Sequence, residues 1–388
     1  MDAVGIICEY NPFHNGHLYH IKCIKKMYPD STIVLVVSGN FLQRGDVSIL
    51  NKWDKARLAL YYGVDIVVEL PFHFATQSAD IFAHGAVSIL NELGVNKLVF
   101  GSESNDIQLL SSLADLQINN KAYDELVQKY LDEGFNYPTA MSKALSSLNN
   151  KTVTKPNDLL GLSYIKEIKL NNYNIKPISI KRTNSYHSKD LLYSISSATS
   201  IREAMKNHID ISMYIPEKVN KYIYYDVSLE KFFPFLKYKI ISEINSLDRY
   251  QTVDEGLDNR IRKVIYNASS YEDLIFKLKT KRYTYNKIKR MLIHILCGFT
   301  KDEANSLKDE IYIRLLGFNE NGKEYLNYIK KNITVDLISN YSTGKNKLDL
   351  EFRVNAIYSS ILDETIRNKV IDMEYKCRPI MNNNSSNN

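Results

Sequence analysis

Two histidines, His14 and His17, lie near the start of the chain, where an apolar strand is followed by a helix. The strand is Val4–Cys8, and we expect Pro12 and Gly16 to end it and to open the helix. Imidazoles at the start of a helix can donate hydrogen bonds to oxygens that gain charge when a phosphorus centre is attacked. Free backbone N–H groups and the positive end of the helix dipole favour an anion at the same place. The spacing therefore predicts a phosphate site.

A second segment, Ser197–Arg202, offers groups that suit further phosphates. Ser200 and Glu203 form a capping box, which predicts a helix that begins at Ser200. The hydroxyls of Ser197 and Thr199 would then lie with the Arg202 guanidinium at the start of that helix. An ordinary capped surface helix explains the same residues. Isolated histidine pairs are also more often structural, and His20, one turn further along, suits a partly exposed surface position.

The two segments resemble the H-x-G-H and S-S-T-x-I-R signatures of the nucleotidylyltransferase superfamily, in the expected order. Over most of its length the chain is similar to the bacterial tRNA(Met) cytidine acetate ligase family. The similarity is carried by Gly5–His20, Ser38–Gly45, Phe100–Glu103 and Lys155–Gly161. Two residues depart from the pattern: Cys8 stands where a valine-like residue is expected, and Asp158 stands where a second asparagine is common.

The resemblance implies that ATP activates acetate as acetyladenylate with release of pyrophosphate, and that the acetyl group passes to N4 of the wobble cytidine (C34) of elongator tRNA(Met). It implies catalytic roles for His14, His17 and Arg202. It also implies an ATP site made of Ile7, Cys8, Glu9, Tyr10, Asn11, Pro12, Phe13, His14, Asn15, Gly16, His17, Leu18, Tyr19, His20, Gly101, Asn157, Arg182, Ser197 and Thr199. ATP usually reacts with Mg²⁺ bound to its phosphates. Cysteines are too far apart for a zinc site, and no residues are assigned as metal ligands.

Several of these residues have a structural explanation as well. Gly101 suits a turn, Asn157 suits a helix cap after Pro156, and Arg182 suits a solvated surface position. Arg44 lies in a segment that resembles the part of this family that closes over the reacting centre. Its guanidinium suits a contact with a carboxylate or phosphate of a ligand, and it equally suits a surface ion pair. Asp80 suits a magnesium ligand or a helix-dipole partner, and we assign it no catalytic role.

The elements that position these groups alternate between short apolar strands and amphipathic helices. Strands are predicted at 33–37, 64–68, 95–100 and 178–180, in addition to the first. Helices follow from the apolar spacing of residues 18–27 and 79–93. This alternation predicts an α/β fold with a parallel sheet, a Rossmann-like catalytic domain over residues 1–207. Ligands should then bind beyond the carboxyl ends of the strands.

Beyond residue 208 the composition changes, and tyrosine, lysine and isoleucine dominate. We predict an α-helical domain over 208–380 and a disordered tail over 381–388. Lys and Arg balance Asp and Glu over residues 1–205, so the net charge of +6 lies in the second part. A cluster of basic residues with interleaved tyrosines suits RNA, although such clusters are more often solvated helix faces. The predicted RNA-binding residues are Lys279, Lys281, Arg282, Tyr283, Lys289 and Arg290.

The chain shows neither a secretion signal nor an apolar run of membrane-spanning length, so we expect a cytoplasmic enzyme. Elongator tRNA(Met) and acetate are the partners expected, and no protein partner or membrane is implied. Two alternatives remain. A small-molecule nucleotidylyltransferase would share both motifs without needing a basic helical domain. A non-catalytic RNA-binding protein would release no pyrophosphate.

Overall fold

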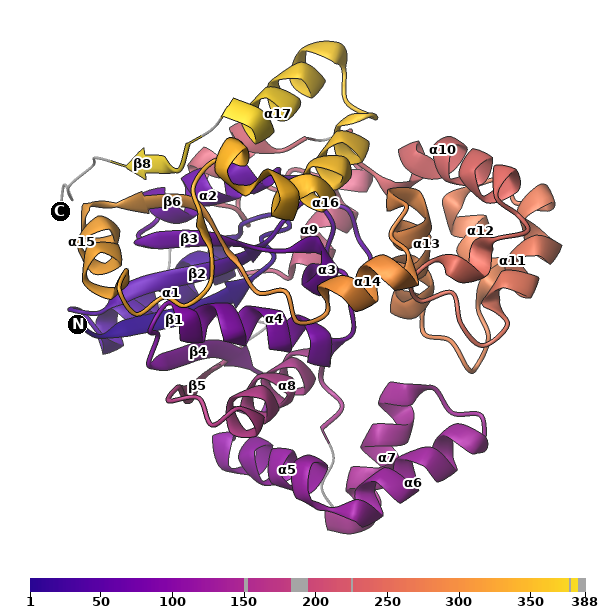
Figure 1. Ribbon diagram of the computed structural model, residues 1–388, viewed down its shortest axis with the longest axis horizontal. Helices are drawn as coiled ribbons and strands as arrows, with labels where there is room; N and C mark the ends of the chain where they lie inside the picture. Colours follow the sequence, from indigo (N-terminus) through magenta and orange to yellow (C-terminus); the bar gives the residue numbers. More distant parts are fainter. Residues whose placement is uncertain (150–152, 183–194, 225, 377, 383–388) are drawn as a thin grey trace.

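A single mixed sheet organises the protein, with its strands in the order β5-β4-β1-β2-β3-β6-β7 and β8 paired with β6 (Figure 1). The computed structural model describes residues 1–149, 153–182, 195–224, 226–376 and 378–382. The first five strands run parallel, and their β-branched residues form buried runs. They are β1 (Ala3–Cys8), β2 (Thr32–Ser38), β3 (Ile66–Leu70), β4 (Lys97–Ser102) and β5 (Lys176–Lys181). The predicted parallel α/β fold is confirmed.

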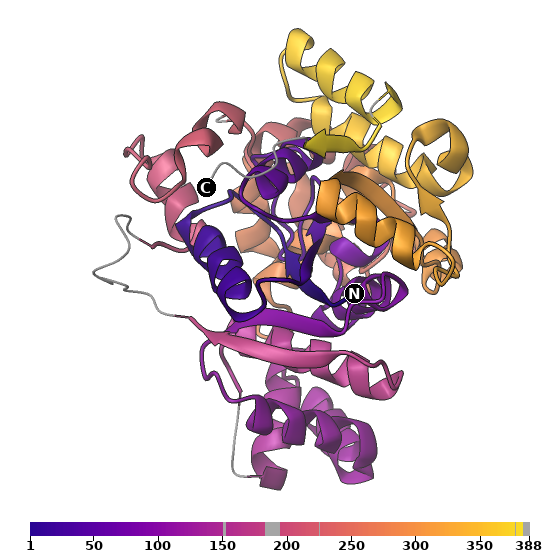
Figure 2. The ribbon, with the colours of Figure 1, turned by 90° about the vertical axis from the view of Figure 1, so that its left-hand side faces the viewer.

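Alternate residues of the central strands face two different apolar cores. Ile33, Leu35 and Val37 face one core, whereas Val34 and Val36 face the other. Helices on both sides complete the layers, and Figure 2 shows the sheet nearly edge-on between them. The first core is covered by α1 (Asn15–Met27) and α2 (Lys52–Tyr61), and the second by α4 (Ala79–Glu92), α5 (Ile107–Asn119), α8 (Pro156–Leu170) and α15 (Glu320–Ile329).

Two helices stand away from the sheet. α6 (Lys121–Asp132) and α7 (Tyr137–Asn149) pack on each other beyond α5 and α8, as Figures 1 and 2 both show. With α5 and α8 they make residues 107–149 and 156–170 almost entirely helical.

The part after residue 208 is mostly helical, as predicted, and its helices share the first apolar core with the sheet. Besides α15, they are α10 (Leu229–Ser242), α11 (Leu257–Val264), α12 (Tyr271–Leu278), α13 (Tyr285–Cys297), α14 (Lys301–Leu307), α16 (Tyr341–Ser359) and α17 (Glu364–Lys376). Two further helices, α3 (Phe72–Ala75) and α9 (Ala198–Lys206), lie earlier in the chain. Short 3-10 turns lie at Glu217–Tyr222, Leu247–Arg249 and Ile265–Asn267.

The same part also contributes three strands that the sequence analysis did not predict. β6 (Ile313–Asn319) pairs antiparallel with β3, while β7 (Leu337–Ile338) and β8 (Ile380–Asn382) pair with β6. The chain therefore returns to the sheet of the first part, so the predicted 208–380 domain is not helical throughout. The prediction of a disordered tail is wrong for Met381 and Asn382, which belong to β8; residues 383–388 lie outside the described residues.

Three histidines lie in the interior without charge. His14, His73 and His294 are each at most 5% exposed. Burial lowers the pKa of His14 to about 3 and the pKa values of His73 and His294 to about 4. The unfolded chain binds protons at these residues below pH about 6.5, whereas the folded chain does not. Their contribution to stability is therefore complete above that pH and is lost as the pH falls toward the folded pKa values.

Each of these histidines is expected to lower the free energy of unfolding by about 1 kcal/mol between about pH 7.5 and about pH 5.5. Buried Glu351, whose pKa burial raises to about 8, acts in the opposite direction over the same range, so a variant is needed to isolate one histidine. Urea denaturation at the two pH values measures the change. His73→Phe removes one titrating histidine and keeps a ring against Phe74 and Tyr312. The pH-dependent loss should then be smaller by about 1 kcal/mol. An identical loss in the variant would contradict this account.

Candidate active site

The predicted site residues gather where the direction of the sheet connections changes. After β1 the chain crosses through α1 to β2 on one side, whereas β4 lies on the other side of β1. In open α/β sheets this switch point, at the carboxyl ends of the strands, is where ligands bind. The turn between β1 and α1 leaves the sheet there, and Gly101 lies near the end of the neighbouring β4. The structure thus brings the first motif and Gly101 to adjacent strand ends.

His14 and His17 cap the helix that they begin. His14 is the N-cap of α1, and its Nδ1 accepts the N–H of Gly16 at 3.0 Å. His17 Nδ1 accepts the N–H of His14 at 3.2 Å, which completes a reciprocal capping box. The two rings stack with their centroids 3.8 Å apart. Because each Nδ1 accepts a hydrogen bond, the proton of each neutral ring is on Nε2.

This arrangement corrects one expectation about the start of α1. The N–H groups of His14 and Gly16 are bound by the two imidazoles, and the N–H of Asn15 donates to Tyr214 O at 3.0 Å. The first backbone donors of the helix are therefore already used, and an anion cannot be held by them as the sequence analysis expected. Gly16 still needs to be glycine, since a Cβ there would lie 2.8 Å from His14 Cε1. The Nε2–H groups of the histidines become the donors available.

Burial and nearby arginines keep the three histidines of α1 neutral. Burial lowers the pKa of His14 to about 3, with Arg182 and Arg202 adding to the effect. The pKa of His17 lies well below its usual value because of burial, His14 and Arg182, and burial lowers the pKa of His20 to about 4. His20 Nε2 is buried and has no hydrogen-bond partner among the described residues. Neutral rings here act as hydrogen-bond donors rather than as fixed positive charges.

Arg202 joins the second motif to the first. Its Nη1 donates to Asn11 O at 2.7 Å, in the turn before His14. Its Nη2 lies 3.1 Å from Asp46 Oδ2, and Asp46 Oδ1 accepts Lys289 Nζ of α13 at 2.9 Å. Asp46 therefore bridges the arginine of the second motif and the basic cluster of the C-terminal helices. Sequence reasoning gave Asp46 no role, because nothing in the local sequence indicates partners 156 and 243 residues away.

The second motif begins its helix one turn earlier than predicted. Ser197 is the N-cap of α9, and its Oγ accepts the N–H of Ser200 at 3.1 Å. The predicted capping box at Ser200 is therefore wrong, because the local Ser197 hydroxyl already caps the helix. Thr199 lies exposed in the first turn. The N–H groups of the first turn have no intrahelical acceptor in an α-helix, so this end of α9 suits an anion.

Gly101, Arg182 and Asn157 lie together at the ends of β4 and β5. The Arg182 side chain crosses Gly101, since a Cβ on Gly101 would lie 3.1 Å from Arg182 Cγ. Arg182 Nη1 donates to Asn157 Oδ1 at 3.4 Å, and Asn157 Nδ2 donates to Glu103 Oε1 at 2.5 Å. Asn157 does not cap α8, because the N-cap is Lys155. The three predicted residues thus form one polar surface beside the histidines.

Asp158, which departs from the family pattern, has a structural role. Its carboxylate accepts the N–H groups of Glu103 and Ser104 at 3.0 Å each. An ionised carboxylate accepts both hydrogen bonds, whereas an asparagine would present an NH₂ group on one side. The aspartate therefore fixes the turn after β4 to the start of α8. Cys8, the other departure, is a partly buried thiol, and desolvation raises its pKa to about 12, so it stays protonated.

Other members of the predicted ATP site have their side chains inside the protein. Tyr10 and Phe13 are at most 1% exposed and belong to the first apolar core, while Ile7 and Leu18 pack against the cores. Tyr10 and Phe13 can therefore reach a nucleotide only through their backbone, whereas Ile7 and Leu18 are partly exposed. The Asn11 side chain binds the backbone of Val47 and Ile49 and fixes the loop after β2.

Glu9 and Gln43 connect the first motif to the same loop. Gln43 N–H donates to Glu9 Oε1 at 2.7 Å, and burial raises the pKa of Glu9. Lys55 lies fully buried nearby and donates to Ser38 O and Gly39 O at 2.9 and 2.7 Å. Burial lowers the pKa of Lys55 to about 7. Sequence reasoning missed Lys55, because no helix was predicted over α2 and nothing in the local sequence shows that most of its residues, charged ones included, are buried.

The predicted RNA-binding residues divide into two groups. Lys289 and Arg290 face the active-site loop, because Lys289 binds Asp46 and Arg290 Nη1 donates to Gln43 O at 3.0 Å. Gly45 packs directly on α13, and a Cβ there would lie 2.6 Å from Arg290 N. Tyr283 is buried, and its OH donates to Glu255 O at 2.5 Å. These three residues position the fold rather than present free side chains.

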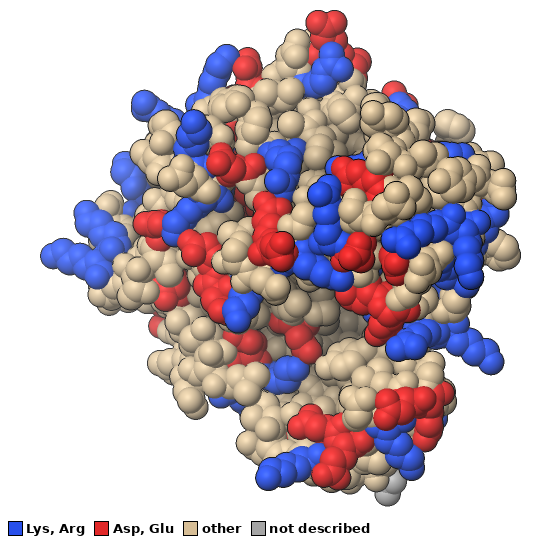
Figure 3. All heavy atoms as spheres, turned by 45° about the vertical axis from the view of Figure 1, so that its right-hand side comes forward, with Lys and Arg blue, Asp and Glu red and all other residues tan. Residues whose placement is uncertain are grey.

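Lys279, Lys281 and Arg282 lie nearer to solvent. Arg282 pairs with Glu255 at 3.3 Å, and Lys279 Nζ lies 5.2 Å from the Tyr285 ring centroid. Figure 3 shows acidic and basic side chains interspersed over the face that it presents, rather than one unbroken basic surface. An RNA contact here would therefore use individual basic residues among acidic neighbours.

A magnesium cage built by the protein alone does not fit the site. The described ranges contain no group of three His, Cys, Asp or Glu residues placed to hold a metal ion. Asp46 binds Arg202 and Lys289, and Glu9 accepts from Gln43. Asp80 accepts Ser163 Oγ at 3.0 Å and pairs with Lys166 at 2.9 Å. Metal ions here would have to enter with a ligand that supplies most of their oxygens.

Comparisons with known proteins agree with this geometry. The profile of the family described as HIGH Nucleotidyl Transferase matches residues 1–372. A tRNA(Met) cytidine acetate ligase of Geobacillus sp. is 41% identical over 98% of this chain and 100% of its own length. The chain belongs to the tRNA(Met) cytidine acetate ligase family. The Bacillus subtilis (strain 168) ligase of the same name is 39% identical over 98% of this chain and 97% of its own length.

Solved structures of this ligase family share the whole fold. The apo form I of Thermotoga maritima TmcAL matches with a TM-score of 0.89 and 30% identity, and it covers 98% of this chain and 99% of its own. A second Thermotoga maritima TmcAL structure, bound with alpha-thio ATP, matches with the same TM-score at 29% identity and the same coverage. The protein is an ATP-using ligase of the HIGH nucleotidyl transferase type. None of its helices, over the part of the chain that is described, is long and apolar enough to cross a bilayer.

Proposed function

We propose that this protein activates acetate with ATP and transfers the acetyl group to N4 of the wobble cytidine, C34, of elongator tRNA(Met). The observation that carries the proposal is the pair of neutral histidines at the switch point of the sheet, with Nε2–H groups as donors. The names of the full-length relatives supply the substrate class. ATP and tRNA place this reaction in the cytoplasm.

In the first step, an acetate oxygen attacks the α-phosphorus of ATP and the bond to the bridging oxygen of pyrophosphate breaks. Negative charge grows on the phosphoryl oxygens as this happens. His14 and His17 donate Nε2–H hydrogen bonds to those oxygens and stabilise the charge. Because both rings are locked by their Nδ1 hydrogen bonds, they need no reorganisation during the reaction. Catalysis is then positioning and electrostatic stabilisation.

The remaining motif residues hold the two ends of ATP. Arg202, Ser197 and Thr199 bind the departing pyrophosphate at the start of α9, where backbone N–H groups and hydroxyls favour an anion. Arg182, Gly101 and Asn157 bind the nucleoside side, on the polar surface at the ends of β4 and β5. ATP would bind together with Mg²⁺, which would neutralise charge on the phosphate oxygens and on the departing pyrophosphate.

In the second step, the N4 amine of cytosine attacks the acetyl carbonyl carbon and AMP leaves with its phosphate oxygen. A mixed anhydride is reactive enough to acylate this weak nucleophile. The cytosine must first be unstacked, as bases of a single-stranded loop can be. The buried histidines and the loop Gln43–Asp46 limit access of water to the anhydride.

The direct test incubates the protein with an elongator tRNA(Met) transcript, ATP, Mg²⁺ and labelled acetate, followed by digestion to nucleosides. Label in N4-acetylcytidine is the expected result, and a transcript with uridine at position 34 is the control. Pyrophosphate release with a different acceptor would favour a small-molecule nucleotidylyltransferase. Absence of pyrophosphate release under every condition would favour a non-catalytic RNA-binding protein.

Replacing Asp46 by Asn should raise the KM for ATP, with a smaller effect on the free energy of unfolding. The change removes the charge that holds Arg202 and Lys289 in place. Hydrogen bonds to charged groups contribute about 1.5–3 kcal/mol, so the KM for ATP should rise by about tenfold. The KM is measured by acetate-dependent pyrophosphate release.

Asp80→Asn is the matched control for this change, since Asp80 is paired with Lys166 outside the site. We expect its KM for ATP to equal that of the wild type. Equal KM values for Asp46→Asn and Asp80→Asn would show that Asp46 does not position Arg202.

A further inference from the structure

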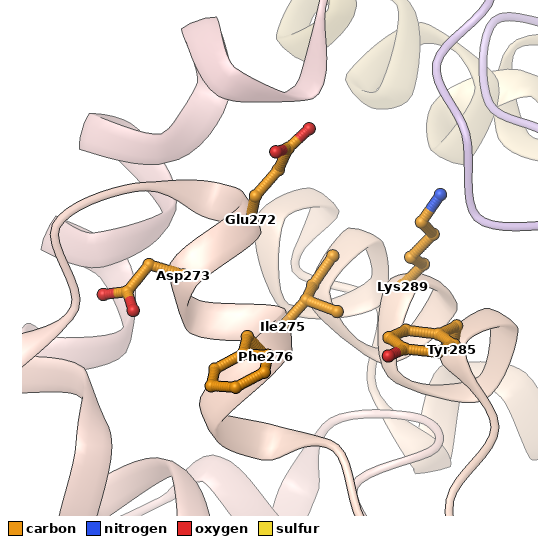
Figure 4. Close-up of a pocket in the computed structure, with 6 residues that line it drawn as sticks. All are labelled: Glu272, Asp273, Ile275, Phe276, Tyr285 and Lys289. Carbon is orange, nitrogen blue, oxygen red and sulfur yellow. The ribbon is translucent and has the colours of Figure 1, made fainter.

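A cavity outside the motif residues lies between α12 and α13. Its volume is about 490 Å³, and it is lined by Glu272, Asp273, Ile275, Phe276, Tyr285 and Lys289. Figure 4 shows the Phe276 and Tyr285 rings on different helices, with Ile275 between them. The cavity is wide open to solvent, so it offers a surface on which a flat group can rest rather than an enclosed site.

Two aromatic side chains of this cavity are unusually exposed. Phe276 is 76% exposed and Tyr285 is 53% exposed, whereas Ile275 between them is buried. The Tyr285 ring is held by Lys279, whose Nζ lies 5.2 Å from the ring centroid. Exposed apolar surface that is flanked by polar residues commonly marks a binding site. Flat ligands can stack on such rings.

Two basic residues beside the cavity favour an anionic ligand. Residues 272–290 contain seven Lys or Arg residues and two acidic ones, but four of the seven are paired: Lys277 with Asp273, Arg282 and Lys287 with Glu255, and Lys289 with Asp46. Lys279, beside the Tyr285 ring, and the exposed Lys281 remain to meet a phosphate. Figure 4 shows Asp273 turned away from the two rings. Exposed rings combined with such lysines suit single-stranded nucleic acid.

The cavity also adjoins the active site. Lys289 lines it and binds Asp46, which in turn binds Arg202. Glu272 at its rim meets α9, the helix of the second motif, through Lys206. An RNA loop that places one base at the histidines would run toward this cavity, where another nucleotide of the loop can bind.

We propose that the cavity between α12 and α13 binds an unstacked base of the single-stranded RNA loop that carries the reacting cytidine, with the base against Phe276 and Tyr285 and a phosphate near Lys279. This inference rests on the proposed function. Stacking on aromatic side chains tolerates different bases, so the site contributes affinity for the loop and holds it while the cytidine reacts.

The test compares Phe276→Ala and Tyr285→Ala with Tyr328→Ala. Tyr328 is 60% exposed on α15 and is the matched control for loss of an exposed ring. Binding of a fluorescent anticodon stem-loop RNA and the KM for tRNA in acetylation are both measured. Each cavity variant should weaken RNA binding and raise this KM by about tenfold, a fold-change typical of one stacked base. Trp at position 285 should restore binding, because it can stack.

Control measurements separate a loss of RNA binding from misfolding and from failure of the proposed function. Acetate-dependent pyrophosphate release and the thermal midpoint should be unchanged in both cavity variants, which excludes misfolding. If the wild type binds the RNA but acetylates nothing, the proposed function fails while the binding comparison still tests the cavity. RNA binding and KM values within twofold of the wild type, or an equal loss in Tyr328→Ala, would overturn the inference and leave the cavity to a different kind of partner.

Discussion

Replacing His17 by Asn is expected to slow acetate-dependent pyrophosphate release from ATP by about 100-fold or more, without lowering stability. The Asn side-chain oxygen can take the place of Nδ1, which accepts the N–H of His14 and caps α1. It cannot supply the Nε2–H donor that the proposed mechanism assigns to the phosphoryl oxygens. Removing one such donor typically costs about 10²–10³ in kcat. The rate of pyrophosphate release at saturating ATP and acetate measures this effect.

A matched pair of variants tests the Nε2–H donor of His17. His17→Gln can place an amide N–H near the position of Nε2, which His17→Asn cannot do, so it should retain more activity than His17→Asn. Glutamine is also a usual capping-box residue at the third position of a helix, so both variants should keep thermal midpoints near that of the wild type. Equal activities in the two variants, or a rate for His17→Asn within threefold of the wild type, would show that His17 does not stabilise the phosphoryl oxygens.

The same variant also assigns the effect to a step. Supplied with synthetic acetyladenylate, His17→Asn should acetylate tRNA at nearly the wild-type rate, because the charge stabilised by His17 develops at phosphorus in the first step. A loss as large as that seen with ATP would place His17 in the acetyl transfer instead.

The order of the elements could be predicted from sequence because it depends on local signals. The apolar runs at 33–37, 64–68 and 95–100 are β-branched, and they become β2, β3 and β4. The His14 and Gly16 spacing correctly predicts a helix start. What the spacing could not show is that the imidazoles cap this helix themselves and so remove its first backbone donors from the site.

Interactions between distant residues account for most of what sequence reasoning missed. β6 is apolar like a buried helix segment, and only its antiparallel pairing with β3 makes it a strand. Lys289 and Arg290 have the composition of an RNA-binding face, yet their partners Asp46 and Gln43 lie more than 200 residues earlier in the chain. Charge pattern alone does not distinguish a basic residue that binds a ligand from one that binds its own protein.

A buried ion cluster fixes the C-terminal helices to the sheet, and breaking it should cost about 3 kcal/mol of unfolding free energy or more. Glu374 of α17 accepts Lys52 Nζ at 3.0 Å and also pairs with Arg314 of β6. Both cations bind Glu69 of β3 as well, at 2.9 and 3.2 Å. Burial opposes ionisation of Glu374, yet Arg314 and Lys52 outweigh it and hold the pKa of that carboxyl below its usual value.

Glu374→Gln leaves two buried cations facing the single carboxylate of Glu69, and the energy of that unpaired charge is what destabilises the fold. Asp372→Asn, two residues earlier in α17, is the matched control, because Asp372 pairs with Lys376 at 2.9 Å and both side chains are more than half exposed. Its effect should be below about 1 kcal/mol. Urea denaturation near neutral pH compares the two variants. Similar midpoints would mean that the cluster tolerates an uncompensated charge, and that α17 is held to β3 and β6 by apolar contacts instead.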